Sequence, residues 1–168
     1  MIETPRLILQ PVTVAHLSAL IAGHTEFEKI FDLKVMDGYL EFPEALKFML
    51  DAMGHDEVAH QWGSYLFIHP GNQALIGMGG FKGIPKAEGM VELGYGVANA
   101  YRGQGYATEA TQGLINFAWQ HNAVQKVWAH TLAEENASVH VLKKCGFTMI
   151  VEVDDPEDGK LWRWQILR

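Results

Sequence analysis

Cysteine is almost absent from this sequence, since Cys145 is the only one among 168 residues. A single thiol cannot form an internal disulfide, and it excludes zinc sites built from several cysteines. Long apolar runs are also missing, because no stretch approaches the roughly 18 residues that a membrane-spanning helix needs. The opening residues, Met1 to Pro5, lack the basic and apolar regions of a secretory signal peptide. We therefore expect a cytoplasmic protein without a membrane anchor.

Basic residues are scarce relative to acidic ones, at 13 against 20, for a formal net charge of −7. Non-specific nucleic-acid binding depends on lysine and arginine that neutralise phosphates, so this balance argues against a nucleic-acid partner. The charge is unevenly distributed: residues 93–147 carry a net charge of +1, and the remainder carries −8. At this length, about 70% of the chain's surface can be buried on folding, which predicts one domain over residues 1–168.

The eight histidines show no pair four residues apart with a supporting carboxylate, so the sequence predicts no metal site. His55 and His60 could line a substrate site, and the remaining histidines are expected to be structural or exposed.

Hydrophobic periodicity predicts a mixed α/β fold in which helical and two-residue patterns alternate along the whole chain. Thr13 could cap the first helix, Pro43 suits the start of the second, and residues 26–42 are ambiguous. The three strands from 62 to 97 form an antiparallel meander, and a crossover helix then joins two parallel strands. The predicted order is βααβββαβαββ, with strands at 7–9, 62–69, 74–81, 90–97, 125–132, 147–153 and 161–167.

Glycine is abundant, and 11 of the 17 glycines lie between Gly63 and Gly105. Gly103 and Gly105 stand between a predicted strand and a predicted helix, where successive backbone N–H groups can turn toward one anion at a helix N-terminus. A Walker loop is excluded because no Gly-Lys-Ser/Thr follows, and Thr108 departs from the dinucleotide-binding fingerprint. From the residues alone, the two glycines either cradle a phosphate or only end a strand and start a helix.

The segments around these glycines resemble the GNAT superfamily of N-acetyltransferases. Arg102-x-x-Gly105-x-Ala107, after a strand that contains Glu92-Leu93-Gly94-Tyr95, is similar to the family's acyl-CoA loop. Thr4-Pro5-Arg6-Leu7-Ile8-Leu9 near the start, and Asn136-Ala137-Ser138 through Lys144-Cys145-Gly146-Phe147 near the end, are similar to the branch that acetylates ribosomal-protein N-termini (RimJ/RimL type). The resemblance covers nearly the whole chain in the same order and implies a GNAT-like acyl-CoA N-acyltransferase fold.

The resemblance implies acetyl-CoA as co-substrate and an amine as acceptor. Backbone amides from Gly103 to Ala107 would hold the CoA pyrophosphate, with Arg102 nearby, and Asn136 would contact the pantetheine arm. An N–H near Gly96 or Val97 would polarise the acetyl carbonyl. The full set of expected cofactor-binding residues is Gly96, Val97, Arg102, Gly103, Gln104, Gly105, Tyr106, Ala107, Thr108 and Asn136.

Catalysis requires a base, because a free alkylamine is mostly protonated at pH 7. Glu92, in the strand beside the expected thioester, is the candidate base and would act through water. Alternatively, Glu92 is an ordinary solvent-facing carboxylate without a catalytic role. Many family members carry a tyrosine acid in the last helix, and Leu142 stands at that position here. Ser138 could stabilise the thiolate instead, with His140 as a distant second, or Ser138 could only cap the helix. Cys145 is expected to be buried and inert, so no acyl-enzyme is predicted.

The acceptor is not defined by any motif. Candidate acceptor contacts in the first helices and the hairpin are Phe31, Asp32, Val35, Tyr39 and Trp62. The function expected is acetyl transfer to a primary amine by direct attack, with a protein N-terminal α-amine or a small amine as acceptor. Two alternatives from other classes are a catalytically silent acyl-CoA-binding module and an unrelated phosphate-binding protein. A homodimer is compatible with the sequence.

Overall fold

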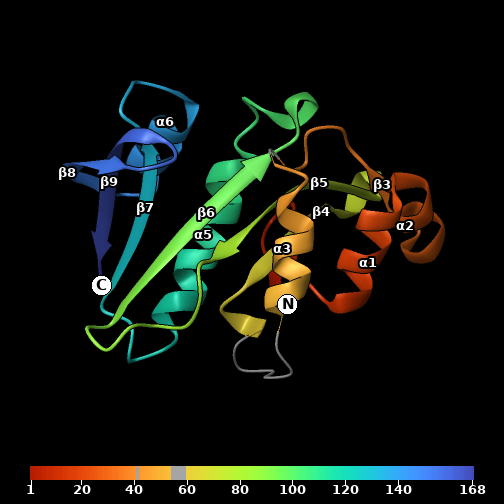
Figure 1. Ribbon diagram of the computed structural model, residues 1–168, viewed down its shortest axis with the longest axis horizontal. Coiled ribbons are helices and arrows are strands. Elements are labelled where there is room, and N and C mark those ends of the chain that lie inside the picture. The colour runs from red at the N-terminus through yellow and green to blue at the C-terminus, as the bar shows by residue number, and fades with distance from the viewer. Residues whose placement is uncertain (41, 54–59) are drawn as a thin grey trace.

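The computed structural model describes residues 1–40, 42–53 and 60–168 of the chain. Helices and strands alternate along it as in an α/β protein (Figure 1). The α-helices are α1 (Val14–Ala22), α2 (His24–Phe31), α3 (Ala45–Ala52), α5 (Tyr106–Trp119) and α6 (Ala137–Lys144). The strands are β1 (Ile2–Glu3), β2 (Ile8–Pro11), β3 (Lys34–Val35), β4 (Ser64–His69), β5 (Ala74–Phe81), β6 (Met90–Val97), β7 (Lys126–Leu132), β8 (Thr148–Asp155) and β9 (Gly159–Leu167).

The strands form one mixed sheet in the order β1-β2-β4-β5-β6-β7-β9-β8, and β3 pairs with β5 off this path. The meander β4-β5-β6 is antiparallel, as the sequence predicts. β6 and β7 are parallel, and α5 is the helix that connects them. The predicted crossover is therefore confirmed, and the mixed α/β fold with it.

The helices α1, α2 and α3 cover one face of the sheet over β4 and β5. Their apolar residues pack on Leu66, Leu75 and Met78 of these two strands. Thr13 caps α1 by accepting a hydrogen bond from the His16 N–H at 3.2 Å, while the His16 ring accepts from the Thr13 N–H. This reciprocal cap confirms the predicted start of the first helix.

The opposite face of the sheet is covered by α5 and α6, which lie behind β6 and β7 in Figure 1. Leu114 and Ile115 of α5 and Val139 of α6 are completely buried in the core on this side. The N-cap of α6 is Asn136, whose side chain accepts a hydrogen bond from the Val139 N–H. Gly146, just after the helix, has a φ of +87°, as expected for a glycine that ends a helix.

The structure adds three elements to the predicted order. The helix α2 begins at His24, just before the ambiguous region 26–42, and ends inside it, and the two-residue strands β1 and β3 are too short to give a period. Residues 70–72, predicted as a turn, form a short 3₁₀ helix. In the part of the chain that the structure describes, no helix is long and apolar enough to cross a membrane.

Candidate active site

The strands β6 and β7 pair over only three residues and then separate. Their register runs from Met90 opposite Lys126 to Glu92 opposite Trp128. Beyond Glu92, β6 stays paired with β5 up to Val97, and β7 stays paired with β9 up to Leu132. The backbones of the two strands therefore diverge toward their C-terminal ends (Figure 1), and the region between them is called the wedge.

Backbone groups of β6 line this wedge in a definite pattern. The Glu92 carbonyl accepts a hydrogen bond from the Lys82 N–H at 2.8 Å, and the Ala98 N–H donates to the Ile76 carbonyl, so both point toward β5. Because N–H and C=O directions alternate along a strand, Gly96 also points toward β5, whereas Tyr95 and Val97 point into the wedge. Of the two predicted N–H donors, the Val97 group has the geometry to reach a ligand there.

The glycine-containing loop after β6 has the conformation that the predicted anion cradle needs. Gly103 and Gly105 have φ angles of +72° and +84°, a region that side chains strongly disfavour, and α5 begins at Tyr106. Residues 102–105 are all exposed. The Arg102 Nε donates to the Val97 carbonyl at 3.0 Å, which joins the loop to the end of β6. The N-terminus of α5 therefore presents its first N–H groups beside an open loop.

The N-terminal segment supports this loop through Arg6, whose role sequence reasoning missed. Its Nη1 donates to the Gln104 carbonyl at 3.0 Å, and its guanidinium lies 4.2 Å from the centre of the Tyr106 ring. Its Nε donates to Glu109 at 2.7 Å, and Thr4 donates to the same carboxylate. Only the tertiary structure could reveal these contacts, because about 100 residues separate the two segments.

A groove of about 960 Å³ begins at this loop and follows α5. Gly105 and Thr108 are the predicted site residues that line it, with Lys144 from the end of α6. The Cys145 thiol donates to the Thr108 carbonyl at 3.6 Å, which holds the two helices together at this point. An extended ligand bound at the loop would lie along this groove, with the Lys144 side chain nearby.

Glu92 lies at the closed end of the wedge and is surrounded by hydrogen-bond donors. Its Oε1 accepts from Lys82 Nζ at 2.6 Å and from His130 Nδ1 at 2.9 Å. Burial raises the pKa of this carboxyl, but the hydrogen bonds from Lys82 and His130 and the charge of Lys82 outweigh burial, so the pKa lies below its ordinary value. Glu92 is therefore a stabilised carboxylate that stays ionised well into the acidic range.

His130 and Arg163 extend this network across β7 and β9. Arg163 Nε donates to His130 Nε2 at 3.0 Å, and since arginine can only donate, Nε2 must be unprotonated. The His130 proton is then on Nδ1 and faces Glu92. The guanidinium of Arg163 also lies 4.5 Å from the centre of a Trp128 ring. The histidine was expected to be structural or exposed, but it contacts the candidate base directly.

The face of the sheet that carries Glu92 is open beside the wedge. Its side chains share the face of Met78, which packs against the helices α1 to α3, but those helices extend only over β4 and β5. Gly94 and Gly96 follow Glu92 on this face, and a Cβ at Gly94 would meet no atom within 4 Å. The only atom near a Cβ at Gly96 would be the Met78 carbonyl oxygen at 3.9 Å. Space for a ligand therefore begins directly beside the carboxylate.

The first turn of α6 lies across the wedge from β6. The Tyr95 hydroxyl donates to the Ser138 carbonyl at 3.2 Å, and Ser138 is half-buried. Leu142, which stands where the resemblance would place a tyrosine acid, is buried. Asn136 uses its side-chain oxygen as the helix cap, which leaves its amide nitrogen for a ligand. Cys145 is buried as predicted, and burial raises the pKa of its thiol to about 11.

Three of the five predicted acceptor contacts are buried in the structure. Val35, Tyr39 and Trp62 are each at most 5% exposed and belong to the core, so the prediction that they contact an acceptor is wrong. Phe31 packs against the His16 ring at 4.6 Å, and Asp32 ends α2. The spacing of these residues did not reveal burial because the segment 26–42 has no clear period. His55 lies outside the described residues, and His60 is half-buried just before β4.

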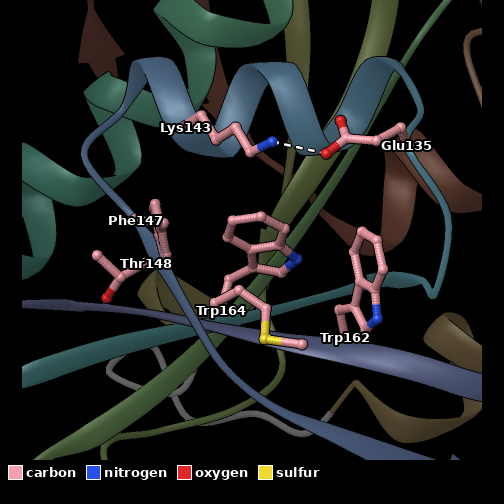
Figure 2. A pocket seen from close by; sticks show the side chains of 7 residues that line it. Glu135, Lys143, Phe147, Thr148, Trp162 and Trp164 are labelled. Atoms are coloured by element: carbon pink, nitrogen blue, oxygen red, sulfur yellow. Dashed lines mark hydrogen bonds and ion pairs between the residues drawn. The ribbon is translucent and has the colours of Figure 1, made fainter.

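A second hollow, of about 400 Å³, lies between α6 and the β8–β9 hairpin. Figure 2 shows the side chains of Trp162 and Trp164 below the Lys143–Glu135 ion pair. None of the predicted site residues lines it. Within residues 1–40, 42–53 and 60–168, no group of three histidine, cysteine or acidic side chains could hold a metal ion.

Comparison with known proteins places the chain in a family. Residues 6–148 match the acetyltransferase (GNAT) domain, so the chain belongs to the GNAT family and is an N-acetyltransferase. An uncharacterised N-acetyltransferase of Bacillus subtilis strain 168, YjdG, is 28% identical over 157 residues, which cover 89% of this chain and 90% of that protein.

Solved structures share the fold at low identity. One is RimL, a ribosomal α-N-protein acetyltransferase in complex with coenzyme A, with a TM-score of 0.71, 17% identity, and coverage of 98% of this chain and 95% of that one. Another is a chimera of the spermidine N-acetyltransferase SpeG from Vibrio cholerae, with a TM-score of 0.68, 16% identity, and coverage of 96% and 95%. Their different acceptors show that this fold alone does not name the amine.

Proposed function

We propose that this GNAT enzyme, acting as one domain over residues 1–168, transfers an acetyl group from acetyl-CoA to a primary amine by direct attack in a ternary complex. The observation that carries the proposal is the wedge between β6 and β7, which has an exposed glycine loop on one side and a carboxylate at its closed end. The wedge supplies unpaired backbone groups for an amide-rich arm, and the loop supplies N–H groups for a pyrophosphate.

The cofactor fits the residues present. The N–H groups from Gly103 to Ala107 would bind the pyrophosphate, and Thr108 and Lys144 would border the nucleotide in the groove along α5. The backbone of Tyr95 and the Asn136 amide would hold the pantetheine arm in the wedge. The Val97 N–H would then stabilise the charge that develops on the acetyl oxygen during attack.

Glu92 is the proposed base and removes a proton from the acceptor ammonium, directly or through water. The amine nitrogen then attacks the acetyl carbonyl, the carbon–sulfur bond breaks, the thiolate leaves near Ser138, and the second nitrogen proton passes to that thiolate. Ser138 and the N-terminus of α6 would stabilise that thiolate, because Leu142 offers no proton. The buried Cys145 takes no part, since its raised pKa keeps the thiol protonated.

Protein N-terminal α-amines are the first acceptor class to test. The face beside Glu92 carries no described helix, so the end of a polypeptide could approach it. Small amines such as polyamines are the alternative, and the open face admits both. A panel of peptides and small amines, with release of free CoA thiol as the readout, separates them by kcat/KM.

The variant Glu92→Gln tests the base. We expect kcat to fall by about 100-fold, as for loss of a general base. In the wild type the acid limb of kcat should lie below the range of an ordinary glutamate, because the Glu92 pKa is lowered. The variant should lack that limb while its Kd for CoA, measured by calorimetry, stays unchanged. An unaltered pH profile would remove Glu92 from the mechanism, and CoA binding without turnover of any amine would favour a silent binding module.

A further inference from the structure

The side-chain amine of Lys82 already forms an ion pair with the candidate base, Glu92. Lys82 follows the last residue of β5, and its backbone N–H donates to the Glu92 carbonyl at 2.8 Å. This bond fixes the start of the side chain opposite Glu92. The ammonium then reaches the Glu92 carboxylate, with 2.6 Å between Nζ and Oε1. The pair therefore has the arrangement that a bound acceptor ammonium and its base would have.

Of the groups around Glu92, Lys82 is the one that can move. Its side chain is 65% exposed, whereas that of His130 is only 16% exposed and is held from behind by Arg163. An ion pair with one partner so exposed adds little to stability, so thermal motion breaks it readily. Next to the pair, Gly94 and Gly96 leave open space on the same face, toward the wedge.

We propose that Lys82 is itself an acetyl acceptor, so that the enzyme acetylates its own Nζ in the absence of another amine. The inference rests on the proposed function of the site. Glu92 takes one proton from the Lys82 ammonium, and the freed lone pair of Nζ forms a bond to the thioester carbonyl carbon. The carbon–sulfur bond breaks, its electron pair leaves with sulfur, and the second nitrogen proton passes to that thiolate. The products are N-acetyl-Lys82 and the CoA thiol, and Glu92 returns its proton to solvent.

Acetylation would change the base that performs it. The amide has no charge, so Glu92 would keep only the His130 hydrogen bond and the more distant Arg163 charge. Asp155, at the end of β8, is a further charged group near the cluster, and backbone hydrogen bonds from Asp158 and Glu157 and the charge of Lys82 keep its pKa low. Loss of the Lys82 cation therefore raises the Glu92 pKa, and the acid limb of kcat toward an added amine moves to higher pH.

The test incubates the purified full chain with acetyl-CoA alone and follows intact mass and acetylated peptides with time. We expect one acetyl group per chain, at Lys82, with a first-order rate constant that does not change over a tenfold range of protein concentration. Lys82→Arg should remove this acetyl group and Glu92→Gln should slow its appearance at least about tenfold. Lys86→Arg is the matched control, since Lys86 is an exposed lysine of the same loop. The Lys86→Arg enzyme should acetylate its Lys82 at the wild-type rate.

The outcomes separate this inference from the proposed function. Turnover of added amines with Lys82 unmodified, or with Lys82 labelled no faster than Lys86, would overturn self-acetylation and leave the enzyme as proposed. A rate that rises with protein concentration would also overturn it, because the transfer would then occur between molecules. CoA binding without acetylation of Lys82 or of any added amine would overturn both proposals.

Discussion

Two neighbouring strands, β5 and β6, are both rich in glycine and use it in opposite ways. A Cβ added to Gly77 or Gly79 of β5 would lie 2.4 or 2.6 Å from a carbonyl oxygen of β6. A Cβ added to Gly94 of β6 would touch nothing. The glycines of β5 therefore allow two strands to pack closely, whereas Gly94 keeps a surface open.

The difference follows from what covers each strand. β5 lies between two layers of helices, and Leu75 and Ile76 on its two faces are completely buried. Among the described residues, β6 has helices on one face only, and one of its edges loses its partner after Glu92. A strand closed on both faces contributes to stability, and a strand with an open face and an open edge is available for chemistry. Each prediction below tests one side of this contrast.

The largest effect is expected for Gly79→Ala on the closed strand. The new methyl group would meet the Gly94 carbonyl oxygen at 2.6 Å and the Tyr95 Cα at 2.7 Å, and both are backbone atoms that cannot move independently. Overpacking of this kind costs about 1–3 kcal/mol, and we expect the upper end of that range. Urea unfolding followed by circular dichroism measures it, and a change below about 0.5 kcal/mol would show that the two strands can separate freely.

A bulky side chain in the loop after β6 should allow the chain to fold but should weaken CoA binding. Gly105→Trp places a side chain at a φ of +84° in front of the first N–H groups of α5. The strained backbone costs about 1–2 kcal/mol of stability. We expect the CoA Kd, measured by calorimetry, to rise on the order of 100-fold, about 2.7 kcal/mol. Retained affinity in a folded variant would place the pyrophosphate elsewhere.

Gly94→Ala is the direct counterpart of Gly79→Ala, one methyl group on the adjacent strand. Because the space there is open, the free energy of unfolding should change by less than about 0.5 kcal/mol. The methyl group would project beside Glu92 into the space proposed for the reacting groups, and kcat/KM should fall about tenfold, or 1.4 kcal/mol. Equal losses of stability in the two variants would abolish the contrast between the strands.

The smallest effect concerns the carboxylate that joins the loop to the N-terminal segment. Glu109 accepts hydrogen bonds from Thr4 and Arg6, and although burial raises its pKa, these bonds lower it overall. The stability it adds is therefore present above the ordinary pKa of glutamate and is lost as pH falls through the lowered value. Glu109→Gln should cost about 1 kcal/mol at neutral pH. Thermal unfolding at several pH values checks this, and a cost that persists unchanged at strongly acidic pH would contradict it.

Much of the fold could be predicted because its signals are local. The caps at Thr13 and Asn136 and the glycine at 146 act within one helical turn, and the structure has all three as expected. The glycine loop at 103–105 was found from the same kind of signal. The helix α2 was missed although its apolar residues recur at helical spacing, because it has only eight residues and overlaps the segment 26–42 that was treated as one ambiguous stretch.

The surroundings of Glu92 could not be predicted because no local pattern encodes them. Lys82, His130 and Arg163 come from three different segments and meet only because of the strand order and register. A slip of one residue would turn each strand side chain to the other face. Likewise, the burial of Val35 and Tyr39 depends on how α1 to α3 pack, and sequence spacing carried no such information.

Residues close together in the chain were enough to predict the family, the order of the main elements and the position of the glycine loop that is proposed to bind the cofactor. The tertiary structure decided that β6 separates from β7 at Glu92, that Val97 and not Gly96 points its N–H into the wedge, and that Lys82 lies on the candidate base. Those properties depend on strand register and on which sheet face the helices leave open. Such features arise only when distant segments pack together.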